Sequence, residues 1–241
     1  MKSLFQNNEI LEIAENLVRK LGNVTTMEKV DIDRITIELF GMKVIYERIA
    51  EYDRDKIACT SNGIDPLVVF RDGRRQQIVF PCKTIILDEY LQRPGQENYR
   101  RYVLGHELGH VILGRIDPRH NAMCFNRVLD GEREYSLDEL RERMNIGESQ
   151  ANFVSCALLL PEFILLNALN KYNEGKKIIV YGDTVVTPTT RICLERMADR
   201  LGVTYKMLFI ELRKHKLIEE RELSEYISVQ VLNEGGDVSE R

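Results

Sequence analysis

The chain has 241 residues, of which 44% are hydrophobic and 30% are charged, and its formal net charge is −4. That length and hydrophobic content are enough for one domain with a full core, with or without a small appendage. The nearly balanced charge excludes an overall basic excess, so neither nucleic acid nor an anionic membrane is expected as the main partner.

The cysteines and the start of the chain indicate a reducing compartment. The five cysteines are odd in number, widely spaced and form no Cys-x-x-Cys pair, so neither a disulfide framework nor a cysteine-based zinc knuckle is expected. The first ten residues include Asn7, Asn8 and Glu9, where a secretory signal would need an apolar run. The longest apolar stretch, 153–166, is interrupted by Pro161 and is too short to span a bilayer. We therefore expect a cytoplasmic protein without a membrane partner.

Two helical segments are predicted near the N-terminus. Apolar residues at helical spacing over 10–21 indicate an amphipathic helix that ends at Gly22. Asp31 is placed to cap a short helix that runs to about Phe40. The β-branched residues at 35–37 are equally compatible with a strand, so both alternatives stay open there.

Short strands are predicted next. They lie in runs rich in β-branched and aromatic residues, at 42–46, 67–70, 77–80 and 84–87. The second and third runs flank Asp72-Gly73, a pair typical of a tight hairpin turn. We expect a small, mainly antiparallel sheet, in which an edge strand could hold an extended peptide, although the same strands could simply complete a core.

A His-Glu-Leu-Gly-His run in the middle of the chain contains two of the four histidines, His106 and His110. Their i to i+4 spacing puts both imidazoles on one face of a helix, where they can hold one metal ion. The buried side of this helix is predicted from its apolar residues, Val103, Leu104, Leu108, Val111 and Ile112. Gly105 and Gly109 each cost about 1 kcal/mol of helix propensity relative to alanine, so we expect another chain segment or a substrate to approach closely there.

A metal site on this helix needs a third protein ligand. Glu148 begins a second helical pattern, and an apolar run then leads to Pro161, so its carboxylate could complete a His-His-Glu site with one position left open for water. The polar, charged segment 115–147 between the two patterns is interpreted as an insertion or lid, with a short helix at its capping-box sequence. Glu132 and Glu134 in this segment are the alternatives for the third ligand.

These two helix patterns resemble the ImmA/IrrE family of zinc metallopeptidases. The residues that carry the resemblance are His106-Glu107-Leu108-Gly109-His110, Glu148-x-x-Ala151-Asn152 and Leu158-Leu159-Leu160-Pro161. The resemblance extends over about 30–220, and only the two helix patterns are specific. The chain departs from the family pattern in a longer span between the patterns and in Ser155-Cys156-Ala157, where Ala-Ala-Glu is common.

The motif and the resemblance together imply a role for each residue. His106, His110 and Glu148 would hold Zn²⁺, which lowers the pKa of bound water and polarises a peptide carbonyl. Glu107 would accept the proton of the water and pass it to the leaving amine. Asn152 is a candidate for orienting a ligand or a substrate carbonyl, and a buried structural amide is the alternative.

The C-terminal part has the outline of a helix-turn-helix. Apolar residues at helical spacing after Pro188 predict two helices joined at Gly202. The basic residues there are offset by acidic ones, so we expect packing or recognition of a protein more than DNA binding, which stays open. His120 and His215 are remote from both metal patterns and are expected to be ordinary surface histidines.

The predicted fold is α+β, a zincin-like core with its small sheet packed on the His-Glu-Leu-Gly-His helix, a second ligand helix and helix-turn-helix-like helices. The expected domains are 1–185 with an insertion at about 115–147, a helical segment 186–225, and a tail 226–241. We expect an intracellular zinc metallopeptidase that cleaves a regulatory protein. The family resemblance implies that a helix-turn-helix repressor is such a substrate. The alternative is a metal-dependent regulatory protein that binds DNA or a repressor without hydrolysis. No residue pattern indicates an oligomeric state.

Overall fold

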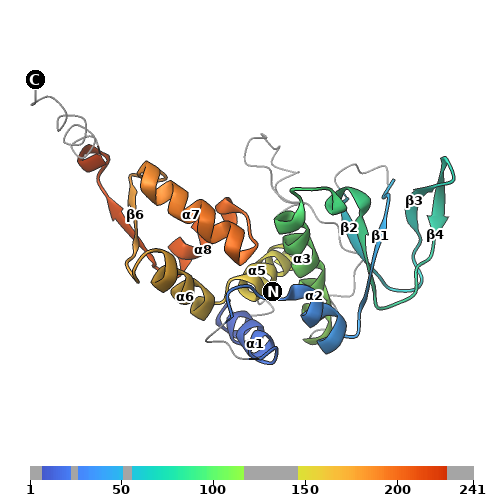
Figure 1. Ribbon diagram of the computed structural model, residues 1–241. Helices are drawn as coiled ribbons and strands as arrows, with labels where there is room; N and C mark the ends of the chain where they lie inside the picture. Colours follow the sequence, from blue (N-terminus) through green and yellow to red (C-terminus); the bar gives the residue numbers. More distant parts are fainter. Residues whose placement is uncertain (1–6, 23–26, 51–55, 117–145, 227–241) are drawn as a thin grey trace, which may run out of the picture. The chain divides into compact units, whose positions relative to one another are not determined.

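The computed structural model describes residues 7–22, 27–50, 56–116 and 146–226, which form helices and small sheets (Figure 1). The predicted α+β class is therefore confirmed. The chain divides into two compact units, residues 1–161 and 162–241. The sequence-based boundaries at 185 and 225, which set off a helical segment packed on or appended to the first domain and a tail, stay predictions.

The first unit begins with helices. Helix α1, Asn7–Arg19, buries one apolar face, as its spacing predicts. Helix α2, Ile32–Arg34, starts at Asp31, whose side chain accepts a hydrogen bond from the backbone N–H of Arg34. It continues as a π-helical turn, Ile35–Leu39, so the strand alternative for 35–37 is wrong. The cap at Asp31 decides between the two alternatives, because it satisfies a backbone N–H that only a helix leaves unpaired.

Three strands form the sheet that lies beside the central helix. Strand β5, Thr84–Asp88, occupies the middle, pairing in parallel with β1, Lys43–Glu47, and antiparallel with β2, Ala58–Ser61. Among the described strands, β1 and β2 are therefore the edges. Strand β2 was not predicted, because its Ala-Cys-Thr-Ser sequence is short and has no alternation of apolar and polar residues.

The predicted hairpin is confirmed. Strands β3, Leu67–Arg71, and β4, Arg74–Ile78, pair antiparallel with Arg71 opposite Arg74. Asp72 and Gly73 between them have φ angles of 50° and 76°, as a tight turn between twisted strands requires. Side chains of the hairpin and the sheet share one core cluster, which consists of Cys59, Leu67, Val69, Phe80 and Ile86.

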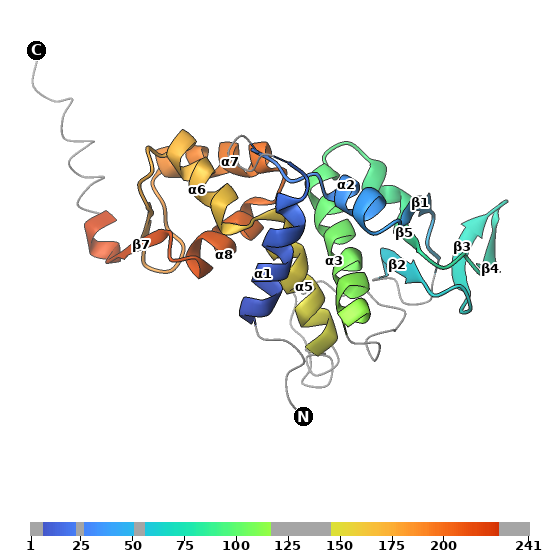
Figure 2. The same cartoon turned by 90° about the horizontal axis from the view of Figure 1, so that it is seen from below.

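Helices α3, Glu97–Ile116, and α5, Ile146–Leu159, lie side by side, with α1 packed against α5 (Figure 2). They touch at the glycines of α3. A Cβ atom on Gly105 would lie 2.5 Å from Ser155 Oγ, and one on Gly109 would lie 2.8 Å from Ala151 O. The close approach predicted from these two glycines is confirmed, and the approaching segment is α5.

The second unit contains helices α6, α7 and α8 and a pair of parallel strands. The bounds are Glu162–Tyr172 for α6, Ile178–Tyr181 for β6, Pro188–Leu201 for α7, Tyr205–Lys214 for α8 and Ile218–Arg221 for β7. Helices α7 and α8 lie where the sequence predicts them, and Gly202 between them has a φ of 67°. The two strands were not predicted. No single helix among the described residues is long and apolar enough to cross a membrane, although α5 and α6 reach that length together.

Candidate metal centre

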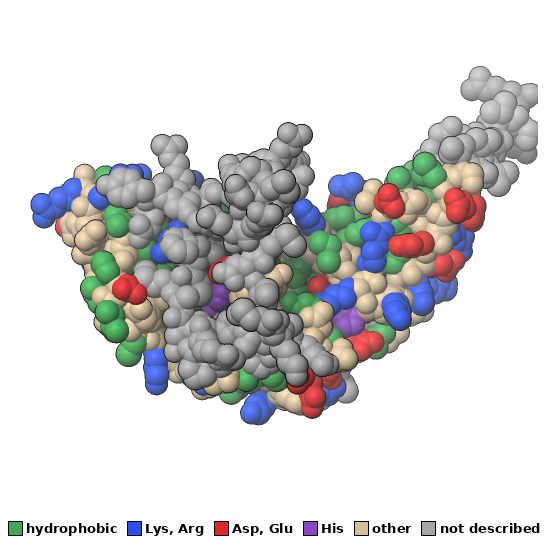
Figure 3. All heavy atoms as spheres, turned by 180° about the vertical axis from the view of Figure 1, so that it is seen from behind, with side chains coloured by type: hydrophobic (Ala, Val, Ile, Leu, Met, Phe, Trp, Pro, Cys, Tyr) green, Lys and Arg blue, Asp and Glu red, His purple; other side chains and the backbone are tan. Residues whose placement is uncertain are grey.

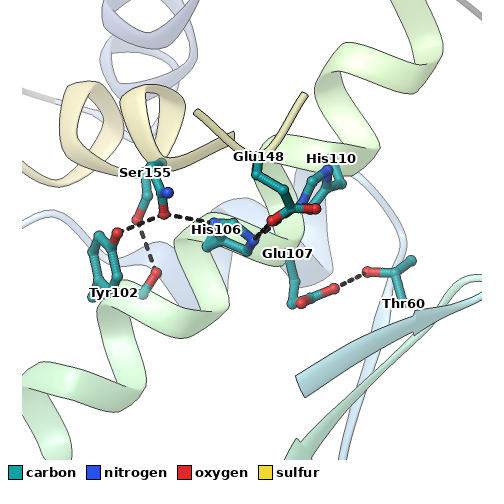
Figure 4. A network of polar contacts seen from close by, with 8 residues as sticks. Thr60, Tyr102, His106, Glu107, His110, Glu148 and Ser155 are labelled. Carbon is teal, nitrogen blue, oxygen red and sulfur yellow. Dashed lines mark hydrogen bonds and ion pairs between the residues drawn. The ribbon is translucent and has the colours of Figure 1, made fainter. Parts of the chain in front are cut away.

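Two elements bring three potential ligand atoms to one point (Figure 4). Helix α3 supplies His106 and His110, whose Nε2 atoms are 2.9 Å apart. The first turn of α5 supplies Glu148, whose Oε2 lies 3.2 Å from His106 Nε2 and whose Oε1 lies 3.5 Å from His110 Nε2. The structure thus brings together the three residues that the sequence assigned to a metal. Glu132, Glu134 and His120 lie outside the described residues.

The position of Glu148 over the histidines follows from the glycines of α3. Gly105 and Gly109 immediately precede His106 and His110 in the sequence and are one helical turn apart. Because neither has a side chain, the backbone of α5 approaches α3 closely enough for the Glu148 carboxylate to reach both imidazoles. The ligand set therefore depends on a helix crossing that larger residues would prevent.

His106 is oriented by a polar network that the sequence located only in part. Asn152 Oδ1 lies 2.8 Å from His106 Nδ1 and accepts a hydrogen bond of 2.6 Å from the Tyr102 hydroxyl. With the amide oxygen there, Nδ1 carries the proton and the lone pair of Nε2 faces Glu148. Ser155 Oγ also donates to the backbone oxygen of Tyr102 at 2.8 Å. Asn152 was a candidate from the sequence, whereas Tyr102 was missed, although it lies one turn before His106.

Glu107 is fully buried and faces the sheet rather than the second helix. Its Oε2 accepts a hydrogen bond of 2.7 Å from Thr60 Oγ1 on β2 (Figure 4). Its Oε1 has no hydrogen-bond partner among the described residues. Burial raises the pKa of Glu107, since the charged form is disfavoured away from water. Thr60 was missed together with its strand.

The pKa values of Glu148 and His106 are shifted in opposite directions. Burial disfavours the Glu148 carboxylate, but its contacts with His106 and His110 outweigh burial and lower the pKa of Glu148 to about 2. Burial likewise opposes a charged His106, yet Glu148 and Glu107 raise the pKa of His106. The carboxylate and the imidazoles therefore stabilise one another's charged forms.

The donor set fits a small divalent metal ion. Nitrogen and oxygen ligands about 2.1 Å from a tetrahedral zinc ion lie about 3.4 Å from one another, close to the observed 2.9, 3.2 and 3.5 Å. Glu148 Oε2 is buried and makes no aligned hydrogen bond, although it lies 3.2 Å from His106 Nε2. A metal ion held by these three residues would satisfy that oxygen.

A cavity of about 510 Å³ adjoins this group. Thr60 and His110 both line it, so it is continuous with the metal centre. The rest of the lining comes from the last turns of α3, from the end of β2 and the turn that follows it, and from the residues before β1 and β5. A volume of this size is in the range of sites that hold small ligands or short peptide segments.

Two histidines and a glutamate are a donor set that metal-dependent hydrolases use. In such hydrolases a second glutamate directly follows the first histidine of the motif, as the buried Glu107 follows His106 here. The chain belongs to the peptidase family described as the IrrE N-terminal-like domain, whose model matches residues 37–213. The resemblance to the ImmA/IrrE family is thereby confirmed.

Other comparisons add less. No curated protein sequence matches the chain. Among solved structures, the chain is similar to one described as a Mycobacterium tuberculosis transcriptional regulator, with 17% sequence identity and a TM-score of 0.43. That similarity covers 84% of this chain and 46% of the other, so this chain spans less than half of that protein's length.

Proposed function

We propose that the protein is a zinc-dependent metallopeptidase that cleaves a regulatory protein in the cytoplasm, such as a helix-turn-helix repressor. One observation carries the proposal: the three potential ligands converge next to buried Glu107, which has one oxygen held by Thr60 and the other without a partner among the described residues. A structural metal site has no use for such a glutamate. Membership of a peptidase family supports the same conclusion.

The chain's own residues supply positioning and proton transfer. Zinc, when bound, lowers the pKa of a water molecule and polarises the carbonyl of the peptide. Thr60 fixes Oε2 of Glu107, so that Oε1 is the oxygen that accepts the proton of the water and returns it to the leaving amine. Asn152 and Tyr102 hold His106 in the tautomer that leaves Nε2 free to bind metal.

Strand β2 is the proposed support for the substrate. It is an edge of its sheet among the described strands, and its Thr60 contacts Glu107. An extended peptide that pairs with this edge would lie beside the ligand set, with backbone hydrogen bonds fixing its scissile carbonyl. The proposed substrate edge is therefore a strand that the sequence did not predict.

The alternative, binding of DNA without hydrolysis, would use α7 and α8. Two of the basic residues at the end of α8 are engaged, Arg213 with Glu220 at 3.3 Å and Lys214 with Glu211 at 3.2 Å. Basic and acidic side chains are also interspersed on the right-hand part of the view in Figure 3, where described residues are visible. Affinity for DNA requires a surface with surplus positive charge, so these pairs weigh against this alternative.

The test mixes the purified chain with the repressor-like protein encoded by the neighbouring reading frame. We expect discrete fragments in the presence of zinc and none after addition of a chelator. Salt-dependent binding of DNA with no fragments under any metal condition would instead support the non-hydrolytic alternative.

A further inference from the structure

We propose that the cavity beside the metal centre binds an acidic segment of the substrate peptide, and that Lys83 and Arg115 recognise its carboxylate. The inference rests on the proposed peptidase function and adds the class of side chain that the enzyme selects. It does not require knowledge of which protein is cleaved.

The cavity is placed where residues next to a cleaved bond would lie. Thr60, the partner of Glu107, and His110, a ligand residue, both line it. A peptide whose carbonyl reached the metal centre would therefore put a neighbouring side chain into this space. The volume of about 510 Å³ accommodates more than one side chain.

Apolar side chains form part of the walls. Met42 and Val111 contribute from the start of β1 and from α3, and Ile64 contributes from the turn after β2. Ile64 is 78% exposed, which leaves a large apolar side chain without cover. Its turn is held in place, because Asn62 Oδ1 accepts hydrogen bonds of 2.9 Å from the backbone N–H groups of Ile64 and Asp65. The methylene groups of a glutamate side chain could pack against such walls.

The charge of the cavity has one sign. Lys83 and Arg115 carry the only formal charges among its described lining residues, and both are exposed. Neither forms an ion pair with a carboxylate of the described residues. Asp65, the acidic residue nearest in sequence to the turn, accepts a hydrogen bond of 2.6 Å from Asn62 and does not line the cavity. An entering carboxylate would thus meet two cations without competition from this turn.

The Arg115 guanidinium is held by contacts with Phe40, whereas Lys83 is fixed at its backbone. The Arg115 guanidinium donates to Phe40 O at 2.9 Å and lies 4.5 Å from the centre of the Phe40 ring, which leaves other N–H donors for a ligand. Lys83 has a φ of 60°, and its backbone oxygen accepts a hydrogen bond of 2.8 Å from Lys43 N. A pre-positioned guanidinium at Arg115 reduces the entropy lost on binding.

Binding is measured with the zinc-loaded full chain carrying Glu107→Gln, so that the probe is not cut. The probes are two blocked peptides that end in Trp and differ only in a central Leu-Glu-Glu-Leu or Leu-Gln-Gln-Leu sequence. The chain contains no tryptophan, so the fluorescence anisotropy of the peptide reports binding directly. We expect the acidic peptide to bind at least about tenfold more tightly, with a difference that shrinks as salt is added.

Charge reversal identifies the residues. Lys83→Glu and Arg115→Glu should each reduce the affinity for the acidic peptide towards that of the neutral one, and Arg115→Lys should retain part of the preference. Lys20→Glu makes the same charge change at an exposed position outside the cavity and should leave the preference intact. Equal or undetectable binding of the two peptides, or a preference that both reversals leave unchanged, would overturn the proposal.

A cleavage assay distinguishes failure of the cavity assignment from failure of the proposed peptidase function. The sites cut in a peptide library by the wild-type chain should show Glu or Asp enriched at one position next to the bond, and Lys83→Glu should reduce that enrichment. Chelator-sensitive cleavage without acidic enrichment contradicts only the cavity assignment. Selective binding of the acidic peptide without any cleavage contradicts only the peptidase function.

Discussion

The two units each bury a glutamate, and the surroundings of the two carboxylates differ. Glu211 in α8 is 2% exposed, and its oxygens lie 3.2 and 3.4 Å from Nζ of Lys214 on the same helix. Glu107 in α3 is fully buried and accepts one hydrogen bond from a strand distant in the sequence, and its other oxygen has no partner in the part of the chain that the structure describes. The first carboxylate is compensated within its own helix, whereas one oxygen of the second is left for a group beyond the described residues. A buried carboxylate of the second kind indicates chemistry.

Replacement of Glu107 tests this distinction with the largest expected effect. Glu107→Gln should keep the zinc content of the protein and lower the cleavage rate by about a thousandfold, since general acid–base catalysis is lost. Zinc is measured by elemental analysis and cleavage by fragment formation. Glu211→Gln is the matched variant, and it should leave the cleavage rate close to that of the wild type. Full cleavage by Glu107→Gln would show that the general base has been assigned wrongly.

Removal of a metal ligand should abolish the stabilisation of the fold by zinc. Zinc at about a hundred times its dissociation constant should raise the free energy of unfolding of the wild-type chain by about 2.7 kcal/mol. The same addition should have no effect on His110→Ala, which should also lose cleavage. His215→Ala removes a histidine of the second unit and should keep the zinc-dependent stabilisation in thermal unfolding. A zinc response in His110→Ala as large as in the wild type would rule out this ligand.

The crossing of α3 and α5 can be tested at its two glycines. Gly109→Ala should destabilise the protein by about 1–3 kcal/mol and weaken zinc binding, because the new Cβ meets the backbone of α5. At Gly105 the nearest atom belongs to a side chain, Ser155 Oγ. Adding Ser155→Ala to Gly105→Ala should therefore restore much of the stability and zinc affinity. Equal behaviour of the two glycine variants, with no rescue, would contradict this account of the crossing.

The smallest effects are expected in the network behind His106. Asn152→Ala should weaken zinc binding by about 10–100-fold, as for other groups that orient a metal ligand. Asn152→Asp keeps an acceptor for the Nδ1 proton and should lose less. Tyr102→Phe removes one hydrogen bond and should cost about 1 kcal/mol of zinc binding free energy.

Tyr99→Phe is the matched control, since this ring stacks on Tyr102 with centroids 6.4 Å apart and its hydroxyl makes no described contact with the ligand set. Zinc affinity is measured by competition with a chelator, alongside thermal unfolding of the metal-free variants. A loss of stability without a change in zinc affinity would make Asn152 a structural amide only.

The parts of the centre that the sequence could predict are those encoded within one helix or at a helix start. The spacing of His106 and His110 is local, and Glu148 opens its own helical pattern. The two glycines are unfavourable in a helix, so their presence predicted that another segment packs closely against them. Thr60 could not be found in this way. Its contact with Glu107 depends on β2 pairing with β5, where Thr60 lies opposite Ile85, and four residues without alternation give no local signal.

The same reason explains why other features of the fold were not predicted from the sequence. Strand β7 consists of Ile218-Glu-Glu-Arg and exists through its parallel pairing with β6, a contact between segments far apart in the sequence. Tyr102 has the sequence context of an ordinary helix residue, and only the crossing of α5 brings Asn152 to its hydroxyl. Local spacing therefore predicts ligands and helices, while groups that orient them emerge from tertiary pairing.

The placement of the ligands on two helices also has a consequence for the entropy of the unfolded chain. A metal ion bound to His106 and Glu148 ties together positions that are about 40 residues apart, as a disulfide would. On the chain-entropy model, closing a loop of that length removes freedom from the unfolded ensemble worth about 4 kcal/mol. The ion would then serve as a removable cross-link, so that the availability of metal in the cell governs how long the folded protein persists as well as whether it can act.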